Sequence, residues 1–295
     1  MKQLIIIIPY FGSWPFWFDA FIESCRYNPN VSWLFYTDCG APQDKPENCS
    51  FIELTFDEYK QLVSQRLGIN FFPINAYKLC DIKPLLGYIH SSDIKEYSYW
   101  AFGDIDVIYG DLLAYYEPLM ERYDFISTHI TRASGHLCII KNCNKLNTAF
   151  QKVKGWNAVI ENPRHQCFDE KHFTKLFIKN KNWPKVLRNI RDKLNPLMED
   201  SFFHEGHTTP NCRIPWHDGT MNFPLWWKWE RGKLTNSLDG EKLYPYLHFM
   251  YWKGEVWVDP LHKSQFYSLG KTLEAGFYIS ENGFHLMPGY PADSV

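Results

Sequence analysis

The residues best placed to do chemistry are two carboxylates, Asp104 and Asp106, separated by a single residue. They follow the aromatic and apolar run Tyr-Trp-Ala-Phe-Gly at positions 99–103, and the apolar pair Val107-Ile108 comes after them. In an extended chain, residues i and i+2 point to the same face, so both carboxylates can reach one cation at the end of a buried strand. Mg²⁺ and Mn²⁺ prefer oxygen ligands and keep open positions for substrate phosphates. The spacing therefore predicts an enzyme that holds a substrate diphosphate through a divalent metal.

An Asp-x-Asp pair also arises by chance in a chain of this size, and most such pairs are solvated loop residues. The residues around this pair are aromatic and β-branched, which is not the composition of a loop. A core strand that ends in two unpaired carboxylates is costly unless a cation compensates them. The metal interpretation is therefore favoured over the solvated loop.

The elements that position this pair follow from the hydrophobic pattern of the first half. Apolar runs predict strands at 4–8, 31–37, 51–54 and 99–102, and helical periodicity predicts helices at 17–26, 56–67 and 75–90, with a break before Pro84. This alternation is typical of an α/β fold with a parallel, Rossmann-type nucleotide-binding sheet. Ligands of such sheets bind at the carboxyl ends of the strands. The loop 9–13, Thr37-Asp38 and the Asp pair all fall there.

The second half of the chain has a mixed pattern. Helices are predicted at 111–123, 145–154 and 169–179, and strands at 125–127, 137–140 and 244–249. Alternating tryptophans and Gly232 predict a β-hairpin over 223–234. Polar clusters at 199–200 and 204–207 lie in a long irregular stretch, for which a mobile acceptor loop or lid is expected.

Composition excludes several classes of protein. The 295 residues, 45% of them hydrophobic, suffice for one large α/β domain with a sizeable core. A net charge of −2 argues against general nucleic-acid binding. The 8 cysteines show no CxxC pair and no metal-ligand spacing, which predicts reduced, mostly buried thiols in a cytoplasmic protein. The apolar run at 4–8 is too short for a membrane span or a signal peptide.

Taken in order, these motifs resemble a known group of enzymes. The matching stretches are Ile-Ile-Pro-Tyr-Phe-Gly (7–12), Tyr-Lys-Leu-Cys-Asp-Ile-Lys-Pro (77–84), Gly-Asp-Ile-Asp-Val-Ile-Tyr-Gly-Asp (103–111), Ser-Gly-His (134–136) and Leu-His-Phe (247–249), which together span nearly the whole chain. They resemble the GT-A fold of metal-dependent nucleotide-sugar glycosyltransferases. More narrowly, they resemble the bacterial polysaccharide glycosyltransferases of capsule, O-antigen and lipooligosaccharide gene clusters. The resemblance implies one GT-A-like domain, with a nucleotide-sugar-binding half at 1–112 and an acceptor-binding half with a C-terminal extension at 113–295.

The resemblance also implies the metal and donor-binding residues. Asp104 and Asp106 would hold Mn²⁺ or Mg²⁺ with His248 as the third ligand, and an imidazole suits Mn²⁺ better. His136 would contact the donor sugar or the acceptor. The further donor contacts, to the nucleoside, the diphosphate or the sugar, would come from Pro9, Tyr10, Phe11, Gly12, Thr37, Asp38, Lys78, Asp81, Lys83 and Ile105. Two alternatives stay open: His248 as a histidine packed in an aromatic cluster, and Lys83 on a solvated helix face.

Asp169 and Glu170 open a predicted helix, where acidic residues are commonly capping or dipole-compensating. The resemblance gives them another role, because the general base of inverting GT-A enzymes sits at such a helix start. Retaining relatives carry an acidic residue there for sugar binding. Asp169 is expected to be the catalytic carboxylate, since Glu170 points about 100° away from it on a helix, and inversion is favoured over retention.

The implied activity is transfer of a hexose from a nucleotide sugar, expected to be a UDP-sugar, to a growing bacterial surface glycan or lipid-linked glycan. Peripheral contact with the cytoplasmic face of the inner membrane is expected through the tryptophans and lysines of 226–233. Two alternatives come from other classes. A haloacid dehalogenase-type phosphohydrolase also uses Asp-x-Asp-Val, but on the first strand of its domain and with a later acidic pair, whereas this chain has no Asp-Asp dipeptide. A non-catalytic carbohydrate-binding protein would use the tryptophans at 216, 226, 227, 229, 252 and 257.

Overall fold

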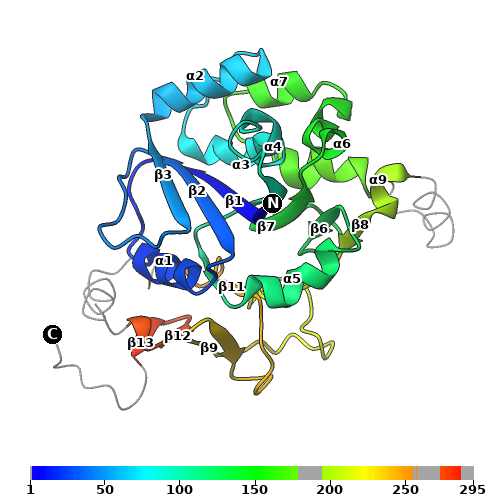
Figure 1. Cartoon of the computed structure of the whole chain (residues 1–295). Helices are drawn as coiled ribbons and strands as arrows, with labels where there is room; N and C mark the ends of the chain where they lie inside the picture. Colours follow the sequence, from blue (N-terminus) through cyan, green and yellow to red (C-terminus); the bar gives the residue numbers. More distant parts are fainter. Residues whose placement is uncertain (1, 179–194, 255–256, 258–272, 287–295) are drawn as a thin grey trace.

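The computed structural model describes residues 2–178, 195–254, 257 and 273–286, which form a mixed α/β arrangement around a central sheet (Figure 1). The strands of this sheet are β1 (Lys2–Tyr10), β2 (Val31–Thr37), β3 (Cys49–Glu53), β4 (Tyr97–Gly103), β6 (Phe125–Ser127), β7 (Leu137–Lys141) and β8 (Ser201–Phe203). Their spatial order is β3-β2-β1-β4-β7-β6-β8. The first four run parallel, β7 is antiparallel to both neighbours, and β6 and β8 are parallel. The sheet is therefore mostly parallel, with a mixed half added to it.

Strand direction brings several chain ends to one edge of the sheet. β1, β2 and β4 end there at Tyr10, Thr37 and Gly103, and β7, which runs the other way, begins there at Leu137. The strand order reverses between β1 and β4, which is where open α/β sheets bind ligands. His136, just before β7, therefore reaches the same edge as the Asp pair.

Two cores fill the two faces of the sheet. In β1, Leu4, Ile6 and Ile8 belong to one core and Ile5 and Ile7 to the other, as alternation of side chains along a strand requires. One face is covered by α2 (Phe56–Leu67), α3 (Leu79–Ile82), α4 (Leu86–Ile89), α6 (Asn144–Asn147) and α7 (Trp156–Glu161). The opposite face is covered by α1 (Phe18–Arg26) and α5 (Leu112–Met120) (Figure 1).

A second sheet lies beyond α1 and α5 (Figure 1). It contains β9 (Trp226–Glu230), β10 (Lys233–Asn236), β12 (Phe277–Ser280) and β13 (Gly283–Leu286), in the order β10-β9-β12-β13. The hairpin expected at 223–234 is thus half of a four-stranded sheet. Of the six tryptophans weighed as a sugar-binding surface, only Trp226 is exposed, at 40%. The other five are buried, so they form core.

Local signals predicted some elements well and others poorly. α2 begins at a reciprocal capping box between Thr55 and Glu58 and ends at Gly68, whose φ is +65°. The helix predicted over 75–90 is instead a series of short turns. They are the 3₁₀ turns Ala76–Lys78 and Lys83–Leu85 alternating with α3 and α4. Pro84 lacks a backbone donor, and its ring disfavours a continuous helix.

The stretch 145–176 also differs from a plain helical pattern. α6 is followed by a 3₁₀ turn, Ala149–Lys152, and by α7, which the hydrophobic pattern did not predict. The predicted helix 169–179 is a π-helix, η4 (Phe168–His172), followed by a 3₁₀ turn, Phe173–Leu176. Residue 179 lies outside the described residues.

The stretch expected to be a mobile lid begins with α9 (Pro196–Glu199) and the edge strand β8. The backbone carbonyl of Thr208 in this stretch accepts a hydrogen bond of 2.8 Å from the amide of His248. Thr208, which directly follows the polar cluster at 204–207, is therefore joined to β11 (Tyr246–His248) by a backbone hydrogen bond. Strands β8, β12 and β13, of 3, 4 and 4 residues, were not predicted.

All 8 cysteines are free thiols, as expected, but only Cys25, Cys49 and Cys138 are buried. The prediction that most of them are buried is therefore wrong. Among the described residues, no helix combines the length and apolar content that crossing a bilayer requires.

Candidate active site

The Asp pair lies in the turn between β4 and β5 (Val107–Tyr109). The amide of Asp104 donates to the carbonyl of His136 at 3.3 Å, which fixes the turn beside β7. Gly103 allows a close approach here, because a Cβ at this position would lie 3.3 Å from both the His136 carbonyl oxygen and the Tyr109 hydroxyl. Asp104 is partly exposed while Asp106 is buried, so one carboxylate faces solvent and the other faces the protein.

His248 reaches the pair through β11 (Tyr246–His248), which is antiparallel to β5 and sets His248 opposite Val107. Ligand atoms of Asp104, Asp106 and His248 all lie within 4.8 Å of one another. The Nδ1 atom of His248 is 3.1 Å from the hydroxyl of Thr209, which orients the ring. Its Nε2 atom is buried, lies 3.6 Å from an oxygen of Asp106, and has no hydrogen-bond partner among the described residues.

An unpartnered buried nitrogen is costly, and native structures rarely keep one without a reason. A divalent cation bound by Nε2 and the two carboxylates would remove that cost, so these residues fit a metal. Packing alone, the alternative for His248, explains the stacking of its ring on His136, with centroids 4.1 Å apart. It does not explain the orientation of Nε2.

Each carboxylate also has a lysine counter-charge. Lys83 Nζ is 2.5 Å from Asp104 and 2.8 Å from the carbonyl of Gly135, so Lys83 is buried in the site rather than on a solvated helix face. Burial lowers its pKa, but Asp104, Cys80 and Asp169 together outweigh burial, and the pKa of Lys83 is raised. Lys253 Nζ is 2.5 Å from Asp106. Burial raises the pKa of Asp106, but His248 and Lys253 together hold it below its ordinary value.

Asp169 and Glu170 meet Lys83 around Gly135. A Cβ at position 135 would lie 3.3 Å from Asp169 Oδ2, 3.8 Å from Glu170 Oε1 and 4.0 Å from Lys83 Nζ. Burial raises the pKa of Asp169 to about 7, although Lys83 opposes the shift. Glu170 is instead partly exposed and pairs with Arg132 at 3.0 Å. A buried carboxyl with a pKa near neutrality is suited to proton transfer.

The loop before Asp169 is held by a buried ion pair. Lys78 Nζ is 2.8 Å from Asp81, and Asp81 accepts backbone hydrogen bonds from Gln166 at 2.7 Å and Phe168 at 2.8 Å. Cys167 between them has a φ of +54°, which is uncommon outside glycine. Lys78 and Asp81, expected to contact the donor, therefore hold the loop that carries Asp169.

Replacing Asp81 by Asn should lower the free energy of unfolding by about 3 kcal/mol, because Lys78 would remain buried without its charge partner. Chemical denaturation followed by fluorescence measures this loss. The control is Asp124→Asn, which breaks a more exposed ion pair with Lys141 and should cost less than about 1 kcal/mol. Equal losses in the two variants would contradict a structural role for the Lys78–Asp81 pair.

The other expected donor residues have mixed environments. Gly12 donates its amide to Asp38 at 2.7 Å, and Tyr10 stacks on Trp14, with ring centroids 5.1 Å apart. Three residues face the interior. Phe11 packs on Phe56 and Tyr59, the Thr37 hydroxyl accepts from the amide of Cys39, and Ile105 is buried. Pro9 lies within β1, opposite Tyr36 of β2.

His136 lies against His248 but is engaged on both ring nitrogens. Nε2 is 2.9 Å from the Tyr246 hydroxyl and Nδ1 is 3.0 Å from the Ser134 hydroxyl. Burial, then the neighbouring His248, keeps its pKa well below the ordinary value, so the ring is neutral. These contacts indicate that His136 packs against His248 and helps to hold its ring in place. The contact with the donor sugar or the acceptor that was expected for His136 stays a prediction.

Sequence reasoning missed Lys253, Thr209 and Tyr77. Lys253 carries no periodic signal, and the only clue was a cation five residues after His248. The ring of Tyr77 is 66% exposed and packs against His165 at 4.8 Å, and the phenol is close enough to Asp104 and Lys83 to feel their charges.

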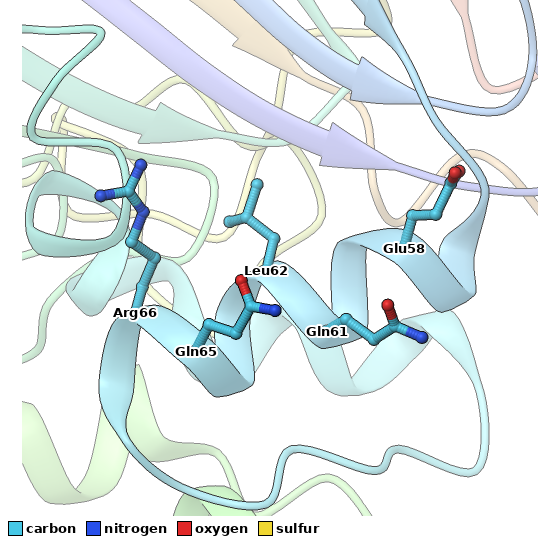
Figure 2. A pocket seen from close by; sticks show the side chains of 5 residues that line it. All are labelled: Glu58, Gln61, Leu62, Gln65 and Arg66. Carbon is cyan, nitrogen blue, oxygen red and sulfur yellow. The ribbon is translucent and has the colours of Figure 1, made fainter.

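A shallow hollow runs along α2, lined by Glu58, Gln61, Leu62, Gln65 and Arg66 (Figure 2). All five residues come from one helix, and none of them is an Asp–Asp–His residue. It is a feature of the helix surface rather than part of the candidate site.

Comparison with known proteins gives one family and several distant structures. The chain resembles the apo form of the glycosyltransferase GlyE of Streptococcus pneumoniae TIGR4, with 12% identity, 61% of this chain and 43% of that chain covered, and a TM-score of 0.33. It resembles mouse xyloside xylosyltransferase 1 with 7% identity, 84% and 97% covered, and a TM-score of 0.38. The chain thus spans less than half of the pneumococcal chain. No curated protein sequence matches it. A family model described as "Family of unknown function (DUF6625)" matches residues 6–285, and the chain belongs to that family.

Proposed function

We propose that this protein is a metal-dependent glycosyltransferase of the GT-A type that moves a hexose from a UDP-sugar to a bacterial surface glycan. One observation carries the proposal. The buried, unpartnered Nε2 of His248 faces Asp106 and Asp104 at the ligand-binding edge of a mostly parallel sheet. In this proposal, residues 1–112 bind the donor and residues 113–295 bind the acceptor.

Asp104, Asp106 and His248 would hold Mn²⁺ or Mg²⁺, with Mn²⁺ favoured by the imidazole. The cation would supply positive charge to the leaving diphosphate. Lys83 and Lys253 flank the carboxylates and would add charge-assisted hydrogen bonds to the same phosphates. Asp169 would take the proton of the acceptor hydroxyl while that oxygen bonds to the anomeric carbon and the bond to the diphosphate breaks, which inverts the configuration.

The direct test is thermal unfolding in the presence of UDP, GDP and CDP, each with Mn²⁺, with Mg²⁺ and with EDTA. UDP with Mn²⁺ should stabilise the protein by about 2.7 kcal/mol at a hundred times its dissociation constant. The other two nucleotides should stabilise it less. If no nucleotide stabilises the protein with either metal, the proposal fails. Equal stabilisation in EDTA would remove the metal from it.

Replacing His248 by Ala should abolish the Mn²⁺-dependent part of UDP binding. Thr209→Val removes only the hydroxyl beside Nδ1 and should weaken Mn²⁺ binding by about 10- to 100-fold, as other outer contacts of metal ligands do. Calorimetric titration of Mn²⁺ in the presence of UDP measures both effects. His204→Ala, a partly exposed histidine outside the site, is the control. An unchanged Mn²⁺ requirement in the His248 variant would leave His248 as packing only.

A haloacid dehalogenase-type phosphohydrolase is less well supported, because the first strand here, β1, ends in Pro9-Tyr10 and not in the Asp pair. A sugar-binding protein that used the tryptophans is also less well supported, since five of those six rings are buried. Hydrolysis of phosphate esters without an acceptor would favour the first class.

We also propose peripheral contact with the cytoplasmic face of the inner membrane. Of the tryptophans in 226–233 only Trp226 is exposed, and Leu225 beside it is 76% exposed. Lys228 pairs with Glu230. The protein should float with vesicles that contain anionic lipid, and Leu225→Ser with Trp226→Ser should reduce the floating fraction several-fold. Flotation that is unchanged in the double variant would contradict this surface, and a wild-type protein that does not float would contradict the membrane contact.

A further inference from the structure

A second concavity lies at the opposite end of the β5–β11 ladder from the Asp pair. It has a volume of about 350 Å³, within the range of small-molecule sites. Its wall is built from separate parts of the chain: the residue after α1, the start of α5, the turn between β9 and β10, and the segment before β11. The residues that line it include Tyr27, Asp111, Tyr115, Arg231, Lys233 and Leu243.

The turn that forms one side of this cavity has an unusual residue. Glu230 pairs with Lys233, so Arg231 and Gly232 form a two-residue turn, with φ values of +47° and +78°. Such turns favour Asn, Asp or Gly at the first position, and an arginine there is strained. Gly232 suits its position, since its φ is positive and a Cβ there would lie 3.1 Å from Tyr27 Cβ. Turn chemistry therefore does not explain Arg231.

The charged side chains at the cavity face solvent and are open to a ligand. Within the described part of the chain, neither Arg231 nor Lys233 has an ion-pair partner, and both are exposed. Asp111 accepts the Ala114 amide through Oδ1 at 2.9 Å, and among the described contacts Oδ2 is not used. Arg231 and Lys233 contribute two positive charges and Asp111 one negative charge, so the rim of the cavity carries a net positive charge.

The remaining walls are aromatic and apolar. Tyr27 and Tyr115 are half-buried, and Leu243 is 57% exposed. A sugar ring matches this combination, because its C–H face can lie on a phenol ring and its hydroxyls can donate to a carboxylate. A carboxylate on the sugar would meet the planar guanidinium, which binds such groups with two parallel hydrogen bonds.

We propose that this cavity binds a pyranose that carries a carboxylate, that is, an anionic residue of a glycan. Asp111 follows Asp106 by five residues, so the cavity lies roughly 15 Å from the Asp pair along the ladder. Its use as a subsite for a distant residue of the acceptor rests on the proposed glycosyl transfer. The binding of the sugar itself does not.

The test compares methyl β-D-glucuronide with methyl β-D-glucoside, which differ only in the carboxylate. Saturation-transfer NMR titrations of the full chain are run in EDTA and without nucleotide. The glucuronide should bind with a dissociation constant on the order of 1 mM, and the glucoside at least tenfold more weakly. Equal binding of the two sugars, or no binding of either, overturns the proposal.

Arg231→Asn is the informative variant, because Asn tolerates a positive φ and keeps the turn while removing the guanidinium. It should unfold at the wild-type temperature or above and bind the glucuronide at least tenfold more weakly. The control is Arg213→Asn, at another exposed arginine, which should bind like the wild type. Wild-type binding by Arg231→Asn overturns the proposal.

Stabilisation by UDP and Mn²⁺ should be the same in Arg231→Asn as in the wild type. The two proposals can therefore fail separately. If the wild type does not bind nucleotide, glycosyl transfer is rejected and the sugar site is unaffected. If Arg231→Asn binds the glucuronide as the wild type does, the sugar site is rejected and glycosyl transfer is unaffected.

Discussion

Replacing Asp106 by Asn should lower turnover by roughly 10³-fold or more and remove the stabilisation by UDP with Mn²⁺. The reason is that a metal ion supplies several kcal/mol of charge stabilisation to a leaving phosphate, and Asp106 would be the more buried of its two proposed carboxylate ligands. The fold should persist. Asn has nearly the same shape, and Lys253, which loses its partner, is 35% exposed and can turn to water.

The control for this variant is Asp44→Asn, since Asp44 is 86% exposed and, among the described residues, forms an ion pair with Arg26 alone. It should keep wild-type turnover and the wild-type response to UDP with Mn²⁺. Thermal unfolding with and without the two ligands separates loss of binding from loss of fold. An Asp106→Asn protein that still transfers sugar in Mn²⁺ at the wild-type rate would reject the metal assignment.

Replacing Asp169 by Asn should lower turnover by about 10²- to 10⁴-fold while UDP binding with Mn²⁺ persists. The wild-type rate should rise with pH and level off above about pH 7, because the pKa of Asp169 is raised to about 7 and only the ionised carboxylate accepts a proton. The variant should lack this rising limb. A rate-against-pH profile and a UDP titration at one pH give both results.

The same pKa predicts a change in stability. An aspartate whose pKa is raised by folding stabilises the protein below its unfolded pKa of about 4, and this contribution is lost as pH rises through about 7. The free energy of unfolding of Asp169→Asn, taken relative to that of the wild type, should therefore rise by on the order of 2–4 kcal/mol between pH 4 and pH 8. Denaturation at the two pH values measures the difference.

Glu170→Gln is the matched control for Asp169, because Glu170 pairs with Arg132 at 3.0 Å and is not buried. It should reduce turnover less than about tenfold. If Asp169→Asn loses UDP affinity as much as turnover, Asp169 binds the donor, and a retaining reaction becomes the better proposal.

The sequence predicted the elements with strong local signals. β2, α2 and β6 occupy the predicted residues, because a continuous apolar run or a capping box marked each of them. The spacing predicted that Asp104 and Asp106 could reach one cation, and only the resemblance placed His248 beside them. Spacing along the chain cannot show that β11 would pair with β5, since strand pairing over such separations depends on the whole fold.

Two of the residues predicted to bind the donor have a structural role that the sequence did not reveal. Lys78 and Asp81 were expected at the donor because they are charged and lie near Lys83 in the sequence. The chain instead buries them as a pair that fixes the loop at 166–168. A buried charged residue and a ligand-binding one have the same identity in a sequence, and only burial and partners distinguish them. The same limit hid Lys253, which is revealed by its contact with Asp106.

The two lysines that neutralise the Asp pair have a consequence for the order in which ligands bind. With Lys83 on Asp104 and Lys253 on Asp106, the four side chains sum to zero charge, so a dication alone would leave the site with an excess of two positive charges. A nucleoside diphosphate cancels that excess. Metal and nucleotide should therefore bind cooperatively, and by linkage each should raise the affinity of the other by the same factor. Free Mn²⁺ would then stay off the enzyme until its donor arrives.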